Sequence, residues 1–275
     1  MFAVILTAGY ATRLYPLTRN TAKPLLKVRG RLIIDFILTK LLREEEIQEV
    51  KIVTNNRFYQ DFLEWSRNRR ARSAGKPVTK PITIVNDRIT SNETRLGAIG
   101  DLAFIVREQG IRDDMLIVAG DNLFNFSLST FVSFFNEKRA PVILVYDAKD
   151  KSLIAGRHGC VVLDNDSRVV DFEEKPENPK TTLACPVFYI IPAAMVNLFE
   201  KYTSETSQNK GMAEGRELGN KGSPDKCSSD APGNFIAWLS KKTSVYAMMM
   251  PGERHDIGSI EGYKAAEGLG ERFFS

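Results

Sequence analysis

The sequence predicts an α/β fold in which a mostly parallel sheet carries helices on both faces. Through about the first 150 residues, short apolar runs alternate with segments whose apolar residues recur at helical spacing. After about Asp150 the pattern changes to short strands joined by tight turns, which is typical of antiparallel pairing. The chain has 275 residues, 43% of them hydrophobic, enough to bury a sizeable core. We therefore expect a Rossmann-like sheet that continues into an antiparallel extension.

The first half of the chain carries the alternating pattern. Strands are expected wherever an apolar run is short, and helices wherever apolar residues line one face. The expected strands are residues 2–7, 50–55, 81–87, 114–122 and 141–148, and the expected helices are 32–43, 57–70, 97–109 and 128–138.

The second half begins with a hairpin. Residues 159–176, "GCVVLDNDSRVVDFEEKP", contain two apolar runs joined by an Asn-Asp-Ser turn. Residues 203–233 are polar and rich in Gly, Ser, Lys and Asp, so we expect a long loop or an insertion there. The remaining expected elements are strands at 182–191 and 245–250 and helices at 193–202, 234–242 and from near Ser259.

Charge and cysteine content exclude several classes of protein. The 38 basic and 34 acidic residues leave a net charge of +4, and the basic stretch 67–81 has no interleaved aromatic residues. We therefore expect no nucleic-acid partner. No apolar run approaches roughly 18 residues, so no membrane partner is expected, and the N-terminal apolar segment is interpreted as a first strand rather than a signal peptide. Three cysteines without metal-type spacing favour free thiols and a cytoplasmic location.

The opening stretch "MFAVILTAGYATRLYPLTRNTAKPLL" joins a strand to a small-residue turn followed by spaced cations. Gly9 permits a close approach of backbone N–H groups to an anion, and Arg13 and Lys23 would add charge. The stretch matches neither G-x-x-x-x-G-K-[ST] nor G-x-G-x-x-G. Its spacing alone leaves an ordinary turn with surface cations as open as a polyphosphate-binding loop.

The same stretch closely resembles the signature L-A-x-G-x-G-T-R-L-x-P-x-T…K-P of sugar-1-phosphate nucleotidylyltransferases. The resemblance implies that Ala8, Gly9, Ala11 and Thr12 bind the phosphates of a nucleoside triphosphate, and that Arg13 and Lys23 are catalytic cations. Ala11 stands where the family more often has glycine. The one-methyl side chain of Ala11 would narrow the approach to the phosphates.

Two aspartates are candidate metal ligands. Asp121 follows an apolar strand and Gly120, where a buried carboxylate needs a cation or a helix N-terminus as partner. Asp256 precedes Gly258 and the N-cap residue Ser259, so a purely structural role beside that helix is open. The resemblance implies that both aspartates hold Mg²⁺, which binds through one or two carboxylates and phosphate oxygens.

Further motifs match the family in order along the chain. In "VVDFEEKP", Glu174 and Lys175 match its sugar-binding glutamate and its catalytic, sugar-phosphate-binding lysine, and Gly159 matches a glycine that lies along the sugar. Asn86 and Gly97 match the residues beside the nucleobase. Cys185 and Pro186 stand where the family usually has a small-residue turn with glycine, which leaves the sugar undetermined.

The resemblance implies a Mg²⁺-dependent attack of a sugar 1-phosphate on the α-phosphorus of a nucleoside triphosphate, giving a nucleotide sugar and pyrophosphate. It implies one domain over residues 1–275, with a nucleotide-binding core at 1–150 and a sugar-binding part at 151–275. Two alternatives stay open: a glycosyltransferase, which should carry a D-x-D motif that "GDNLF" lacks, and a non-catalytic sensor of nucleotide sugars. Assembly into a homo-oligomer, the base and the pathway are left open. Glucose 1-phosphate with UTP or dTTP is the substrate pair that is most frequent in the family.

Overall fold

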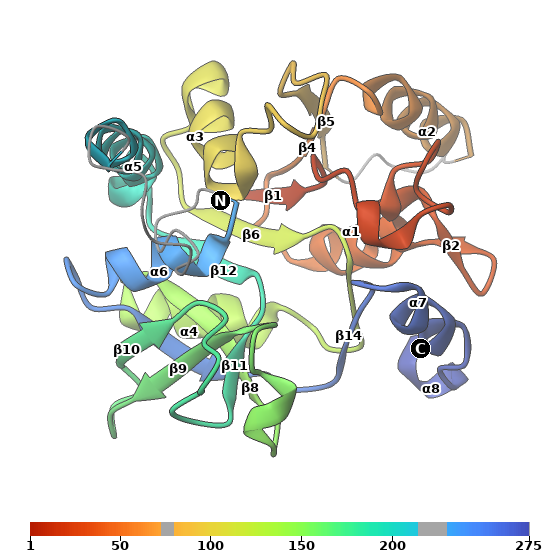
Figure 1. The fold of residues 1–275 in the computed structure, drawn as a ribbon. Helices are drawn as coiled ribbons and strands as arrows, with labels where there is room; N and C mark the ends of the chain where they lie inside the picture. Colours follow the sequence, from red (N-terminus) through yellow and green to blue (C-terminus); the bar gives the residue numbers. More distant parts are fainter. Residues whose placement is uncertain (73–79, 214–229, 275) are drawn as a thin grey trace.

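A ten-stranded sheet runs through the molecule (Figure 1). The computed structural model describes residues 1–72, 80–213 and 230–274. The strands lie in the order β10-β9-β11-β8-β12-β6-β1-β4-β5, and β13 pairs with β8. They are β1 Phe2–Leu6, β4 Glu49–Thr54, β5 Ile82–Asn86, β6 Met115–Ala119, β8 Val142–Asp147, β9 Gly159–Leu163, β10 Val169–Glu173, β11 Leu183–Cys185, β12 Phe188–Ile191 and β13 Tyr246–Met249.

The strands β6, β1, β4 and β5 form a parallel block. Leu6, near the end of β1, lies opposite Val53 on one side and Ala119 on the other. The carboxyl ends of these strands therefore meet at one edge of the sheet, the edge at which open α/β folds bind ligands.

Strand β12 joins this block to the antiparallel part of the sheet. It runs antiparallel to both β6 and β8, and β11, β9 and β10 extend the antiparallel pattern. Both halves of the chain thus contribute to one sheet, which agrees with the predicted mixed architecture.

Helices cover both faces of the sheet (Figure 1). Side chains alternate along β1, so Ala3 and Ile5 join the core under α1, α2, α4, α7 and α8, whereas Val4 joins the core under α3, α5 and α6. None of the described helices is long and apolar enough to cross a membrane. The helices are α1 Ile33–Arg43, α2 Tyr59–Arg72, α3 Gly97–Gln109, α4 Ser129–Lys138, α5 Leu198–Ala213, α6 Pro232–Leu239, α7 Ile260–Glu267 and α8 Glu271–Phe274.

Several predicted boundaries were wrong. The predicted strand 182–191 is divided at Pro186 into β11 and β12, and helix α5 occupies residues up to Ala213 that were predicted as loop. The predicted loop also ends early, because α6 begins at Pro232; residues 214–229 lie outside the described part of the chain. Short strands not predicted at all are β2 Lys27–Val28, β3 Arg31–Leu32, β7 Asn122–Phe124 and β14 Arg254–Asp256.

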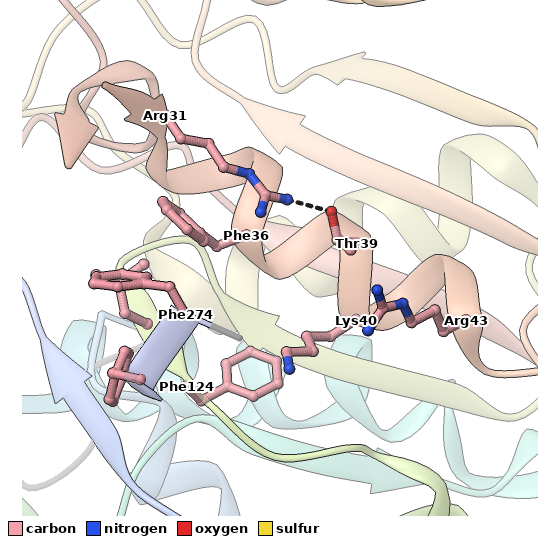
Figure 2. A pocket seen from close by; sticks show the side chains of 9 residues that line it. Arg31, Phe36, Thr39, Lys40, Arg43, Phe124 and Phe274 are labelled. Carbon is pink, nitrogen blue, oxygen red and sulfur yellow. Dashed lines mark hydrogen bonds between the residues drawn. The ribbon is translucent and has the colours of Figure 1, made fainter. Parts of the chain in front are cut away.

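The C-terminal helix α8 docks on α1 through aromatic side chains. The rings of Phe36 and Phe274 lie 5.0 Å apart, and the guanidinium of Arg31 stacks 4.3 Å from the centre of the Phe36 ring. Figure 2 shows these side chains around a small cavity of about 60 Å³, with Arg31 also donating a hydrogen bond to Thr39. Burial lowers the pKa of both Arg31 and Lys40 at this cavity. The last helix is thus held by aromatic packing and by an ion pair between Arg29 and Glu271 at 4.0 Å.

The ring of Phe188 packs β12 against the segment that follows β6, which includes β7. Phe188 is fully buried, and its ring lies 5.1 Å from that of Phe124 and 5.9 Å from that of Phe126. Removal of a buried phenyl group leaves a cavity at the junction of the two halves of the sheet. We expect Phe188→Ala to lower the free energy of unfolding by about 3–5 kcal/mol, measured by urea unfolding.

The control for this prediction is Leu153→Ala, because Leu153 is 52% exposed. It should change the free energy of unfolding by less than about 0.5 kcal/mol. Equal losses in the two variants would contradict the assigned role of Phe188.

Candidate active site

The opening loop after β1 is anchored at both ends and open in the middle. The backbone N–H and Oγ1 of Thr7 both donate to the Val53 carbonyl, at 2.9 and 2.6 Å, and Asn55 donates to the Ala8 carbonyl at 2.7 Å. A methyl group added at Gly9 would meet no atom within 4 Å. Hydrogen bonds to β4 and to Asn55, which follows it, therefore hold the residues before Gly9, and the space beside Gly9 is free.

Ala11 takes the left-handed backbone conformation, with φ of 48°. Side chains disfavour this region by about 1–2 kcal/mol, so the glycine of the motif is the less strained residue here. The Ala11 carbonyl accepts a hydrogen bond from Thr18 at 2.8 Å, which helps to hold the turn into the 3₁₀ segment Thr12–Leu14. Thr12 and Arg13 are exposed, and within the described residues the Arg13 guanidinium has no hydrogen-bond or ion-pair partner.

Lys23 and Asp121 form the central ion pair of the site, with Nζ and Oδ2 2.6 Å apart. Lys23 lies in the 3₁₀ segment Lys23–Leu25, and Asp121 comes directly after Gly120 at the end of β6. Burial acts to raise the pKa of Asp121, but the charge and hydrogen bond of Lys23 outweigh it and the pKa is lowered. Asp121 is therefore a carboxylate at neutral pH.

The position of Asp121 depends on Gly120. A methyl group at Gly120 would lie 2.7 Å from Cγ2 of Thr7 and 2.9 Å from the Leu6 carbonyl oxygen. The Gly120 N–H also donates to that carbonyl at 2.9 Å. Only glycine lets the two chain segments approach closely enough for Lys23 to reach Asp121.

Asp256 reaches the same place on a separate short strand. Strand β14 pairs with β7 so that Asp256 lies opposite Asn122, and the Ile257 N–H donates to the Asp121 carbonyl at 3.3 Å. The two aspartates predicted as metal ligands are thus carried by neighbouring, hydrogen-bonded segments.

Arg254 is a site residue that the sequence reasoning missed. Its side chain is only 9% exposed; Nη2 lies 3.2 Å from Oδ1 of Asp256, and Nε donates to Oδ1 of Asn122 at 2.6 Å. Residues two apart on a strand face the same side, so the pattern Arg-His-Asp was a usable signal. Arg254 fixes the Asp256 carboxylate much as Lys23 fixes Asp121.

The two carboxylates suit a divalent cation that also binds substrate oxygens. Their side chains are 24% and 37% exposed, so an ion can reach both. Both supply only hard oxygen donors, which Mg²⁺ prefers. In the described part of the chain, no cluster of three or more carboxylate, imidazole or thiol groups forms a ready metal cage. Asp121 and Asp256 are the residues that could hold such an ion.

Glu174 lies between two glycines at the other end of the site. A methyl group would come 1.9 Å from Oε2 of Glu174 if added at Gly233 and 3.2 Å from it if added at Gly159. Burial raises the pKa of Glu174, opposed by Lys175, whose Nζ lies 3.8 Å from Oε1. Gly233 was predicted to lie in a loop. Its contact with Glu174 was missed, because only the folded chain brings α6 against Glu174.

His158 and Tyr146 form a ring pair near Arg254. Burial lowers the pKa of His158, and the charges of Arg254 and Lys175 act on it in the same direction, against that of Asp256. The rings of Tyr146 and His158 are 6.3 Å apart, and the Arg254 guanidinium lies 5.8 Å from the Tyr146 ring centre. His158 therefore feels the charges of both Asp256 and Lys175. His255 instead pairs with the Gly262 carbonyl at 2.8 Å.

Cys185 is a buried neutral thiol. Burial and the charge of Glu174 raise its pKa, and Sγ contacts the Pro186 carbonyl at 3.5 Å. It packs in the apolar core rather than offering a nucleophile.

The residues predicted beside a nucleobase bracket the turn between β5 and α3. Asn86 ends β5; its amide donates to Asn56 at 2.8 Å and accepts from the Arg88 N–H at 2.8 Å. Gly97 begins α3 with φ of 77°, a conformation that favours glycine. These residues lie at the same carboxyl edge of the sheet as the opening loop.

The family model for nucleotidyl transferases matches residues 2–267. A glucose-1-phosphate adenylyltransferase of Rhodopirellula baltica is 27% identical over 283 residues, covering 96% of this chain and 58% of that protein. The bifunctional protein GlmU of Methanococcus aeolicus is 28% identical over 184 residues, covering 66% of this chain and 38% of its own. The chain spans less than two thirds of the length of these curated relatives.

Solved structures share the fold. A protein described as a glucose-1-phosphate thymidylyltransferase from Bacillus anthracis aligns with a TM-score of 0.72 at 21% identity, covering 99% of each chain. A UDP-glucose pyrophosphorylase complexed with UDP-glucose aligns with a TM-score of 0.74 at 16% identity, covering 97% of each chain. With the family match over nearly all of its length, the chain belongs to the nucleotidyl transferase family.

Proposed function

We propose that the protein joins a sugar 1-phosphate to the nucleotidyl group of a nucleoside triphosphate and releases pyrophosphate. The observation that carries this proposal is the pair of carboxylates Asp121 and Asp256, which lie on neighbouring hydrogen-bonded segments and are each paired with one cation. Two anionic substrates that repel each other need such a distribution of positive charge. Residues 1–150 would bind the nucleotide and residues 151–275 the sugar.

The triphosphate would lie along the opening loop. Gly9 offers free space for close approach, the exposed Arg13 is free to move onto a phosphate, and Lys23 lies at the junction with Asp121. Ala8, Ala11 and Thr12 would line the same anion path through backbone groups. Neutralisation by Arg13 and Lys23 would stabilise charge that develops on the departing pyrophosphate.

Asp121 and Asp256 would hold Mg²⁺, which supplies positive charge beside the α-phosphate when bound. Lys23 lowers the pKa of Asp121 and keeps that carboxylate ionised, and Arg254 orients the carboxylate of Asp256. A protonated carboxyl group would be a poor ligand for Mg²⁺. The positive charges of Lys23 and Arg254, which favour the carboxylate form, would therefore contribute to metal binding.

The sugar 1-phosphate would bind at Glu174, Lys175 and Gly159. Lys175 is 48% exposed and can turn its ammonium group to the sugar phosphate, while Glu174 can accept hydrogen bonds from sugar hydroxyls. Gly159 would leave the sugar room to lie along β9.

The chemistry needs no side-chain nucleophile. An oxygen of the sugar phosphate forms a bond to the α-phosphorus, the bond from that phosphorus to the bridging oxygen breaks, and pyrophosphate leaves with the electron pair. The attacking phosphate is already ionised near neutral pH, so no general base is required. The residues align the reactants and offset charge.

The first test measures pyrophosphate release with ATP, UTP, dTTP, CTP and GTP against glucose 1-phosphate and other sugar 1-phosphates, with and without Mg²⁺. Glucose 1-phosphate is the first acceptor to test because the names of the adenylyltransferase and thymidylyltransferase relatives contain it. We expect one pair to give Mg²⁺-dependent release. Binding of a nucleotide sugar without release would favour a sensor, and direct sugar transfer from a nucleotide sugar would favour a glycosyltransferase.

Asp121→Asn should lower kcat at least about 100-fold, because the carboxylate that would hold the ion is lost while the volume is kept. Initial rates across a Mg²⁺ titration measure the effect. The control is Asp166→Asn in the exposed hairpin turn, which should keep the wild-type rate. An Asp121→Asn variant with wild-type rate and Mg²⁺ dependence would refute the metal assignment.

Gly233→Ala should raise KM for the sugar 1-phosphate about 10-fold or more and leave KM for the triphosphate unchanged, because the new methyl group displaces the Glu174 carboxylate. Steady-state kinetics with each substrate varied in turn will measure the two KM values separately. Gly270→Ala is the matched control, since a methyl group there meets no atom within 4 Å. Equal changes in both KM values would count against a sugar-specific role.

A further inference from the structure

Two buried carboxyl groups face each other at the turn between β5 and α3. Asp87 directly follows β5 and is 4% exposed; Asp101 lies in the second turn of α3 and is 5% exposed. The side chains of Asp87 and Asp101 interact through a hydrogen bond, and Oδ1 of Asp101 is a buried atom without a hydrogen-bond partner in the described part of the chain. No cation of the described chain forms an ion pair with either group.

Such a pair requires a proton. Two buried carboxylates in contact cannot both be ionised without a large electrostatic cost, so they titrate as a unit that retains one proton. Burial and the charge of Asp87 raise the pKa of Asp101 well above its usual range, and burial raises the pKa of Asp87 to about 6. Asp101 is the donor of the shared hydrogen bond and Asp87 the acceptor.

The other titratable groups around the pair do not supply a counter-charge. Tyr10 of the opening loop faces Asp87, and burial together with the Asp87 charge raises the pKa of Tyr10. Asp230, which precedes α6, adds a further negative charge that acts on Asp101, although Asp230 is itself paired with Arg95 at 2.7 Å. Arg88 pairs with Glu108 on α3. Each of these groups favours the neutral form of Asp101 or leaves it unchanged.

Asp87 organises the turn that follows Asn86. Its Oδ1 accepts from the Ile89 N–H at 2.7 Å, and its own N–H donates to the Thr54 carbonyl at 2.9 Å. The Ile89 carbonyl accepts from the Asn56 N–H at 2.9 Å and from the Tyr10 hydroxyl at 3.4 Å. Asp87 thus ties this turn to β4, and through Ile89 to the opening loop.

Asp101 connects the other end of the same segment. It lies four residues after Gly97, on the helix that Gly97 begins. Its hydrogen bond to Asp87 therefore bridges the two ends of residues 87–97, which no strand pairing joins.

We propose that Asp101 acts as a neutral carboxylic acid that positions the nucleotide, because its hydrogen bond to Asp87 sets the spacing between Asn86 and Gly97. The inference rests on the proposed function for the assignment of the nucleobase to these two residues. Asp101 is a positioning residue, since it acts through Asp87 and does not touch the nucleotide.

Two substitutions of similar volume separate this role from simple packing. Asp101→Asn keeps a donor towards Asp87, whereas Asp101→Leu removes it and leaves Asp87 as a buried carboxylate without that partner. We expect Asp101→Leu to weaken binding of the triphosphate by about fivefold or more, and Asp101→Asn to stay within about twofold of wild type. Calorimetric titration of UTP, dTTP and ATP in the presence of Mg²⁺ measures affinity without requiring turnover.

The matched control is Val106→Ala, which truncates a buried side chain further along α3. It should lower the melting temperature but leave triphosphate affinity and both KM values unchanged. In Asp101→Leu, KM for the sugar 1-phosphate should also stay within about twofold, since the altered turn lies on the nucleotide side.

Infrared difference spectroscopy tests the neutral acid directly. At pH 8, wild type minus Asp101→Asn should show the carbonyl stretch of a protonated carboxylic acid. Absence of that band, or equal triphosphate affinity in wild type and Asp101→Leu, would overturn the inference. Wild type that binds a triphosphate but releases no pyrophosphate would refute the proposed reaction alone, whereas wild type that binds no triphosphate would refute both.

Discussion

The ion pair between Lys23 and Asp121 is the contact on which the arrangement of the site depends. Its partners are 98 residues apart in sequence and 2.6 Å apart in space, because β1 and β6 are neighbours and Gly120 lets their ends close together. Removal of one partner would leave the other charge partly buried and uncompensated, which is far more costly than the loss of an exposed pair. The opening loop and the end of β6 are therefore positioned by each other, and any ligand that lies on the loop meets Asp121 at a defined place.

Arg254 and Asp256 add a second ion pair to this arrangement. Lys23, Asp121, Arg254 and Asp256 carry no net charge as a group, so the site can exist without a bound ion or phosphate. In the proposed reaction the carboxylates would bind the ion and the cations would turn partly to phosphate oxygens. Because Arg254 also donates to Asn122, its guanidinium keeps its orientation even when Asp256 changes partner. The cluster thus holds two cations and two carboxylates in fixed positions before any substrate binds.

Local rules predicted most of the fold and part of the site. The bounds of α3 were predicted to the residue, because a glycine begins the helix, apolar residues repeat at helical spacing and Gly110 ends it in a left-handed conformation. Asp121 could be selected because carboxyl ends of parallel strands meet at one edge. Strand β14 was not predicted, so the two-residue spacing that places Arg254 and Asp256 on one face was not used. Gly233 and Asp101 were missed for another reason: their roles come from contacts with Glu174 and Asp87 that only tertiary packing creates.

The acids at this edge of the sheet differ in protonation state. At the end of β6, Lys23 holds the pKa of Asp121 below its usual range and keeps it charged. At the end of β5, two acids pair without a cation and share a proton, so that together they carry one negative charge rather than two. A charged carboxylate is useful where phosphates and a divalent ion would meet, whereas a second negative charge beside an uncharged aromatic base would only add repulsion towards the incoming triphosphate. In the proposed binding mode, the ionised Asp121 would lie at the phosphate end, where a divalent ion would offset the negative charge, and the pair of acids with its single negative charge would lie at the base end.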